Sequence, residues 1–130
     1  MPEPLNRDET FLISVLREFK FLIPLGYHIA DVSLHPRSVG VSYQNKRIGR
    51  ALYVEYEFGS GISIEIWGKP RAFSFMRGRN ISQAYADHPK VAGIPEPSYA
   101  TEEQFSEILK GYGSLLSDEF SQVLKGERWF

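Results

Sequence analysis

Apolar residues recur at helical spacing near both ends of the chain and alternate with polar residues between them. The N-terminal pattern predicts a helix from about Glu9 to Ile23, with Asp8 as its N-cap and Pro24 at its end. A capping-box spacing at Thr101 predicts the start of a last, long helix. The apolar stripe of that helix comprises Phe105, Leu109, Tyr112, Leu116, Phe120, Val123 and Leu124.

The central half of the chain alternates with the period of two that is typical of half-buried strands. Strands are predicted over residues 28–34, 38–44, 52–58 and 62–67, with a short fifth over 71–76. In the first strand, His28, Ala30, Val32 and Leu34 are expected to share one side. Gly59-Ser60-Gly61 is the clearest hairpin signal. A short helix over 80–88 and an irregular loop over 89–100 complete the prediction.

These elements predict an α+β fold in one domain that spans residues 1–130. It consists of an N-terminal helix, an antiparallel meander of four to five strands, a short helix and a long C-terminal helix. Alternating strands bury only one face of their sheet, and the amphipathic helices are available to cover that face. We therefore expect the opposite face to meet solvent or a partner.

Composition narrows the possible functions. With 42% apolar and 14% aromatic residues, the 130-residue chain can bury a core, and the absence of cysteine excludes disulfides and thiolate metal sites. No signal sequence or apolar run of membrane-spanning length is evident, so we expect a cytoplasmic protein without membrane contact. A formal net charge of −1 argues against a protein whose main role is to bind nucleic acid.

No residue pattern indicates catalysis. His28, His35 and His88 lack the spacing of metal ligands or of a catalytic group, and Gly59-Ser60-Gly61 leads into a strand, where a nucleophile elbow would lead into a helix. The sequence therefore predicts a protein that is not an enzyme and that has no metal and no cofactor.

The polar side of the sheet is the first candidate binding site. It is predicted to carry Tyr53, Glu55, Glu57, Glu65 and Trp67. A solvated face and a protein-binding face both fit these residues. A large exposed aromatic residue beside carboxylates, such as Trp67, is typical of an interface anchor. Packing of Trp67 beneath the loop over 89–100 fits the sequence equally well.

A basic stretch is the alternative site. Arg71, Arg77 and Arg79 lie just before the predicted short helix, whose N-terminus would favour an anion. The alternative function is therefore a nucleic-acid or phosphate-binding module that uses the basic loop around residues 71–79.

The order of features resembles the small immunity and immunity-like proteins of bacterial polymorphic toxin and contact-dependent inhibition systems. The resemblance rests on a first helix that closes on Gly26-Tyr27, on Val39-Gly40-Val41-Ser42-Tyr43, on an acidic and apolar hairpin from Val54 to Ile66, and on the tail Leu124-Lys125-Gly126-Glu127.

The resemblance implies a protein that binds and neutralises a cognate toxin domain by occlusion, with no catalytic residues. The toxin would be its partner, and we expect the chain itself to be a monomer or a weak homodimer. The acidic residues Glu102, Glu103 and Glu107 of the last helix are a second possible contact.

Overall fold

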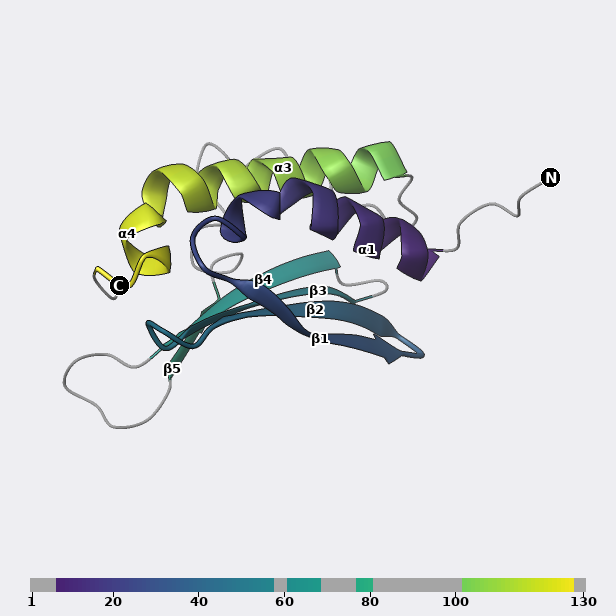
Figure 1. Ribbon diagram of the computed structural model, residues 1–130. Coiled ribbons are helices and arrows are strands. Elements are labelled where there is room, and N and C mark those ends of the chain that lie inside the picture. Colours follow the sequence, from purple (N-terminus) through teal and green to yellow (C-terminus); the bar gives the residue numbers. More distant parts are fainter. Residues whose placement is uncertain (1–6, 58–60, 69–76, 81–101, 128–130) are drawn as a thin grey trace.

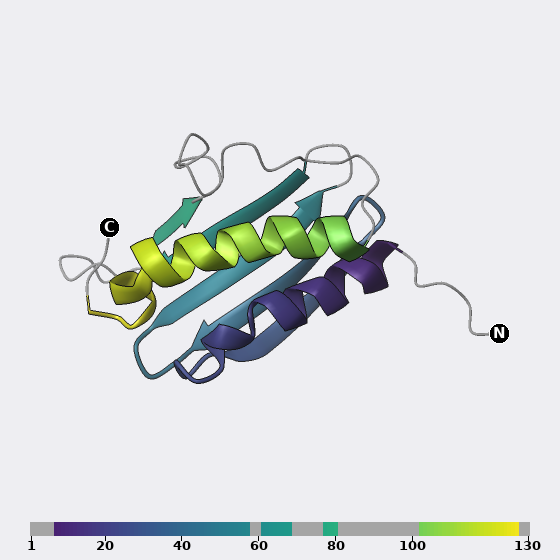
Figure 2. The ribbon, with the colours of Figure 1, turned by 90° about the horizontal axis from the view of Figure 1, so that it is seen from above.

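Helices and strands form two layers, with both long helices on the same side of an antiparallel sheet (Figures 1 and 2). The structure is a computed structural model that describes residues 7–57, 61–68, 77–80 and 102–127. In chain order the elements are α1 (Arg7–Glu18), the 3-10 turn η1 (Lys20–Leu22), β1 (His28–His35), β2 (Ser38–Asn45), β3 (Arg50–Glu57), β4 (Gly61–Gly68), β5 (Arg77–Asn80), α3 (Glu102–Glu119) and α4 (Ser121–Leu124). The predicted α+β class is confirmed, as is an antiparallel sheet of four strands, β1 to β4.

The strands lie in sequence order, β1-β2-β3-β4-β5, and each pairs with the next in antiparallel register. The register places Val41 opposite Val54 and Val54 opposite Ile64, so apolar residues form rows across the sheet. In β2, β3 and β4 these residues are buried, and most of those between them are half-buried. The alternation of apolar and polar residues in the sequence therefore results from burial of one face of the sheet.

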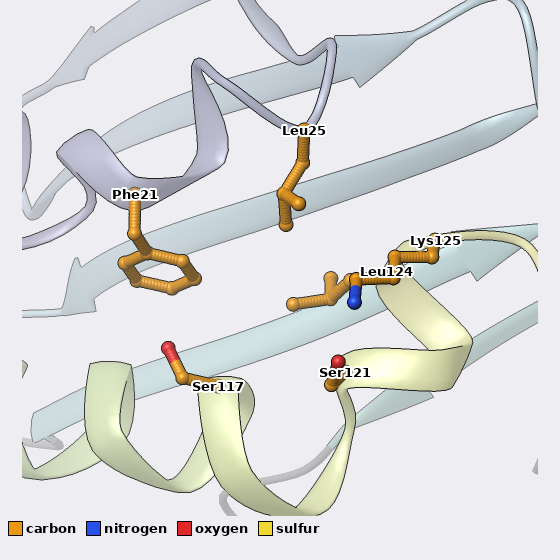
Figure 3. A pocket seen from close by; sticks show the side chains of 6 residues that line it. All are labelled: Phe21, Leu25, Ser117, Ser121, Leu124 and Lys125. Atoms are coloured by element: carbon orange, nitrogen blue, oxygen red, sulfur yellow. The ribbon is translucent and has the colours of Figure 1, made fainter.

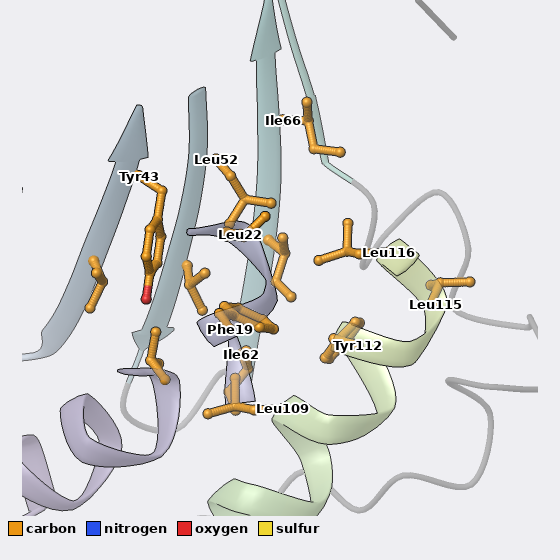
Figure 4. Packing of buried hydrophobic residues seen from close by; sticks show 14 of the residues in the cluster. Phe19, Leu22, Tyr43, Leu52, Ile62, Ile66, Leu109, Tyr112, Leu115 and Leu116 are labelled. Atoms are coloured by element: carbon orange, nitrogen blue, oxygen red, sulfur yellow. The ribbon is translucent and has the colours of Figure 1, made fainter. Parts of the chain in front are cut away.

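The core lies between the covered face and the helices (Figure 4). Its helical part comes from α1, η1, α3 and α4 and from Phe19 and Phe120, which join them. The buried residues are Phe11, Val15, Phe19, Leu22, Ile108, Leu109, Tyr112, Leu115, Leu116, Phe120, Val123 and Leu124. The two long helices lie side by side and run in roughly the same direction (Figure 2). Arg17 of α1 donates a hydrogen bond to Ser106 of α3. No helix in the described ranges is long and apolar enough to cross a membrane.

Both predicted helices differ from the observed ones at their ends. The first begins at Arg7, so Asp8 lies in its first turn and is not the N-cap, and it ends at Glu18 before η1. The last is interrupted at Phe120, whose φ of −116° and ψ of 16° are not helical, and α4 follows as a separate turn. Phe120 is nevertheless buried, so the apolar stripe continues across the break.

In the first strand, the residues that share one side of the sheet differ from those predicted. The register shifts between Ile29 and Asp31, as in a β-bulge, and a bulge changes which side chains share a face. Ile29, Val32 and Leu34 therefore pair with residues of the covered face, and the expected grouping of Val32 and Leu34 with His28 was wrong, since His28 pairs with Gln44 of the other face.

The predicted fifth strand over 71–76 lies outside the described residues. A short strand, β5, begins one residue after the predicted end and pairs with β4, so that Arg77 lies opposite Gly68 and Arg79 opposite Ile66. The predicted helix over 80–88 and loop over 89–100 also fall outside the described ranges, apart from Asn80 at the end of β5, and they stay predictions.

The segment after α1 ends in a Schellman motif, in which a glycine of positive φ lets the chain leave the helix. The amide of Tyr27 donates to the carbonyl of Leu22 at 3.1 Å, and Gly26 has φ +102°. The side chain of Asn45, from β2, then donates to the carbonyl of Leu25 at 3.0 Å. The Gly26-Tyr27 step is therefore a helix end that is tied to the sheet.

The C-terminal helix ends in the same way. The amide of Glu127 donates to the carbonyl of Gln122 at 2.9 Å, and Gly126 has φ +76°. A left-handed glycine followed by an amide that returns to the helix is the usual reason for glycine at this position. The Leu-Lys-Gly-acidic tail thus has a local structural role.

Two side chains join this C-terminal end to the rest of the fold. The Tyr27 hydroxyl donates to the carbonyl of Leu124 at 2.7 Å, and Nε of Arg50 donates to the carbonyl of Val123 at 3.2 Å. Burial raises the pKa of Tyr27 well above its ordinary value, and the charge of Arg50 opposes that rise only in part. Tyr27 therefore keeps its proton and its hydrogen bond over the physiological range.

Replacing Tyr27 with Phe removes the hydrogen bond to Leu124 and leaves a buried carbonyl without that donor. We expect Tyr27→Phe to lower the free energy of unfolding by about 1–3 kcal/mol. Urea denaturation followed by circular dichroism measures this loss. Ser114→Ala, at an exposed position of α3, is the control and should change stability by less than about 0.5 kcal/mol. Equal midpoints for Tyr27→Phe and the control would contradict the role of Tyr27.

Candidate protein-binding face of the sheet

The sheet surface that points away from the helices is the candidate site (Figure 1). We call it the outer face. On β1 to β4 it comprises His28, Asp31, Ser33, His35, Ser38, Gly40, Ser42, Gln44, Ala51, Tyr53, Glu55, Glu57, Gly61, Ser63, Glu65 and Trp67, which alternate with the residues of the covered face. None of the described helices lies against it, since α1 and α3 are both on the other side.

All five residues predicted for the site lie on the outer face. Tyr53 of β3 stands directly opposite Glu65 of β4, and Trp67 stands opposite the small side chain of Ala51. Trp67 is 39% exposed, so part of its indole is accessible to a partner. Tyr53, Glu55 and Glu65 are half-buried among their neighbours, and Glu57 is exposed.

Three carboxylates of the outer face accept hydrogen bonds from the residue two positions along the same strand. The Tyr53 hydroxyl donates to Glu55 Oε2 at 2.9 Å, and Nε1 of Trp67 donates to Glu65 Oε2 at 3.0 Å. In β1, Ser33 Oγ donates to Asp31 Oδ2 at 3.2 Å. Because residues i and i+2 share a face, each bond holds a carboxylate against the sheet surface.

Tyr53 lies flat across β2, over Gly40. A Cβ atom at position 40 would stand 2.8 Å from Cζ of Tyr53, closer than real Cβ contacts allow, so only glycine leaves room for the ring. Burial raises the pKa of Tyr53 to about 12; the hydrogen bond to Glu55 and the charges of Glu55 and Glu65 add to the rise, and the nearby Ser33 hydroxyl of β1 opposes it. Tyr53 therefore links β3 to β1 across the strand between them.

Sequence reasoning missed Asp31, Ser33 and Gly40 as members of this group. Asp31 and Ser33 carried a usable signal, because they alternate with Val32 and Leu34 and the bulge lies before all four residues. Gly40 carried a usable signal, since glycine inside a strand often marks the close approach of another group. No pattern in the sequence shows that this group is Tyr53, because Gly40 and Tyr53 lie on different strands.

The outer face is acidic. Asp31, Glu55, Glu57 and Glu65 all lie on it, and none of its described strand positions carries lysine or arginine. Among the described residues, no three His, Cys, Asp or Glu side chains are close enough to hold a metal ion. Such a surface can bind a basic partner through oriented carboxylates and an exposed indole.

The alternative basic site is only partly described. Arg71 lies outside the described residues, and the backbones of Arg77 and Arg79 belong to β5, so these two residues lie in a strand where the sequence predicted a loop. The acidic residues proposed as a second contact are likewise divided. Glu107 is exposed on α3, whereas the side chains of Glu102 and Glu103 are outside the described set.

A pocket opens between η1 and the C-terminal helices (Figure 3). It is lined by Phe21, Leu25, Ser117, Ser121, Leu124 and Lys125, and its volume is about 210 Å³. Small-molecule sites usually exceed about 300 Å³. The lining contains neither a carboxylate nor an imidazole that could serve as an acid or base, so the pocket does not compete with the outer face as the candidate site.

Because Tyr53 contacts Gly40, replacing this glycine with alanine is expected to change stability in the direction opposite to the usual one. Alanine normally stabilises a strand relative to glycine by about 0.5–1 kcal/mol. Here Gly40→Ala displaces the Tyr53 ring, so we expect it to destabilise the protein by about 1–3 kcal/mol and to return the pKa of Tyr53 toward 10. Chemical denaturation and alkaline titration of tyrosine absorbance measure the two effects.

The matched control for Gly40→Ala is the same substitution made together with Tyr53→Ala. With the ring removed, alanine at position 40 should be neutral or stabilising. If Gly40→Ala has the same effect with and without Tyr53, the ring does not depend on Gly40.

Comparison of the chain with family models, curated proteins and solved structures finds no match in any of the three. The resemblance to bacterial immunity proteins therefore stays a prediction.

Proposed function

We propose that this chain is an immunity-type protein that binds and neutralises a cognate bacterial toxin domain by occlusion. The outer face of the sheet is the proposed contact, with Tyr53, Glu55, Glu57, Glu65 and Trp67 at its centre. The proposal gives the protein no catalytic role and no cofactor, and it places the protein in the cytoplasm.

The observation that carries the proposal is the pairing of an exposed indole with an oriented carboxylate on an acidic face. Trp67 is 39% exposed while its Nε1 donates to Glu65. Protein interfaces concentrate their binding energy in a few aromatic anchors. A tryptophan already held by a hydrogen bond loses less conformational freedom on binding than a free one would.

The carboxylates support the same proposal. Glu55 and Glu65 each accept one hydrogen bond from their own strand, and a carboxylate has lone pairs for further donors. A lysine or arginine of the partner can use them. Charge complementarity of this kind accelerates association and discriminates against partners of the wrong charge.

Occlusion requires a broad contact with little rearrangement, and β2, β3 and β4 meet that requirement. Their outer residues belong to a sheet anchored on its covered side by a continuous core. A surface built on regular strands holds its side chains more exactly than a surface built on loops. The proposed contact is therefore largely formed before the toxin arrives.

The probe is a cognate toxin domain, to be sought among secreted proteins encoded beside the gene of this chain. Trp67→Ala should weaken binding of the toxin domain by about thirtyfold or more, and Glu65→Lys should weaken it and slow association. Both variants should keep the wild-type circular dichroism spectrum, because surface substitutions change stability by about 0.5 kcal/mol. Calorimetry and stopped-flow association measure the two effects.

Glu107→Lys is the matched control, since Glu107 is exposed on α3, in the other layer. It should leave binding unchanged. If both outer-face variants bind normally and Arg77→Ala and Arg79→Ala lose binding, the binding site is the basic segment and not the outer face. If no secreted toxin encoded beside this chain binds it or is neutralised by it, the immunity function is wrong.

A further inference from the structure

Among the described strands, the first one of the sheet has a free edge. In the part of the chain that the structure describes, β1 pairs with β2 alone, and its residues are exposed apart from half-buried Ser33. Natural edge strands usually avoid self-association through charged side chains (lysine above all), proline or very short length. The eight residues of β1 contain neither lysine nor proline. Its protective features are the charged Asp31 and the bulge between Ile29 and Asp31, and residues 31–35 keep a regular register.

The free edge also carries apolar side chains that the core leaves uncovered. Val32 and Leu34 pair with Val41 and Val39 of the covered face, yet they are 43% and 62% exposed. Their partners on β2 are both fully buried. The apolar layer of the sheet therefore continues one strand beyond the part that the helices protect.

The sequence of this edge is complementary to itself. In an antiparallel pair of β1 strands centred on Ser33, Val32 of each copy stands opposite Leu34 of the other. Asp31 of each copy then stands opposite His35 of the other, and both residues are exposed. Apolar pairs thus meet on the covered face and acid–imidazole pairs on the outer face, with each pair occurring twice.

We propose that two copies of this chain associate through β1, in antiparallel register about Ser33, to form one continuous sheet. The arrangement has the two-fold symmetry in which the same surface of each copy contacts the other. It does not depend on the proposed toxin binding, because β1 pairs through its edge and leaves the outer faces of β3 and β4 open.

The helices do not obstruct this pairing. α1 contacts β2, yet Val32 and Leu34 of β1 stay 43% and 62% exposed. The helix therefore leaves this part of the edge accessible to a second copy. Since five residue pairs form a small interface, the dimer is expected to be weak, with micromolar to millimolar affinity.

A single introduced cysteine tests the register directly. The chain contains no cysteine, and directly opposed residues of antiparallel strands have Cα atoms about 4.5–5.5 Å apart, which suits a disulfide. Ser33→Cys should therefore form a covalent dimer rapidly under mild oxidation. Ser42→Cys, one strand further in on the same face, is the matched control and should cross-link only at the rate of random collision.

Charge exchange tests the same pairing without a cross-link. His35→Asp places carboxylates opposite each other twice, and we expect it to raise the dimer dissociation constant about tenfold in sedimentation equilibrium. Combining it with Asp31→His restores opposite partners and should return the constant to within about threefold of wild type. Leu34→Lys, at a 62% exposed position, should abolish the dimer while leaving the fold intact.

The proposal is overturned if the wild-type chain sediments as a monomer at millimolar concentration. It is equally overturned if a dimer forms but Ser33→Cys cross-links no faster than Ser42→Cys, because the interface then lies elsewhere. Loss of the dimer in His35→Asp without recovery in the double variant would also contradict the proposed register.

Discussion

Both helices lie on one side of the sheet because their apolar stripes pack on its covered face, and hydrogen bonds at the ends of two helical segments fix those ends in place. Tyr27 and Arg50 donate to carbonyls of α4, and Asn45 donates to the carbonyl of Leu25 at the end of the first segment. These carbonyls lie where helices leave acceptors without intrahelical partners. The three side chains donate hydrogen bonds to these carbonyls. They thereby connect both helix ends to β2, to β3 or to Tyr27, the residue just before β1.

The uncovered side of the sheet follows from this arrangement. With both helices on the covered face, the outer face must be stabilised by its own side chains, and Tyr53 shows how this occurs. Its ring fills the space above Gly40, and its hydroxyl orients Glu55. Trp67 orients Glu65 in the same way. The acidic face is consequently organised without any covering element among the described residues, which suits a surface that binds a partner with little rearrangement.

The sequence was most informative where one periodicity decided the structure. Alternation predicted β2, β3 and β4 and grouped the five site residues on one face, because burial of one side of a sheet imposes a period of two. It failed at β1, where the bulge after Ile29 changes the alternation, and at Phe120, where the backbone leaves the helix while the side chain stays buried. The cues Gly26-Tyr27 and Gly126-Glu127 that suggested immunity proteins are both helix ends with left-handed glycines, which helices of many folds require.

Chemical-shift mapping with the cognate toxin domain tests whether the outer face binds a protein. The chain has two tryptophans, so the indole N–H signal of Trp67 can be assigned by replacing Trp129. Toxin binding should shift this signal together with the amide signals of Tyr53, Ser63 and Glu65, and it should leave the amide signals of α3 unchanged. If the shifts are confined to α3 and the C-terminal turn and the Trp67 indole signal does not move, the outer face is not the binding site.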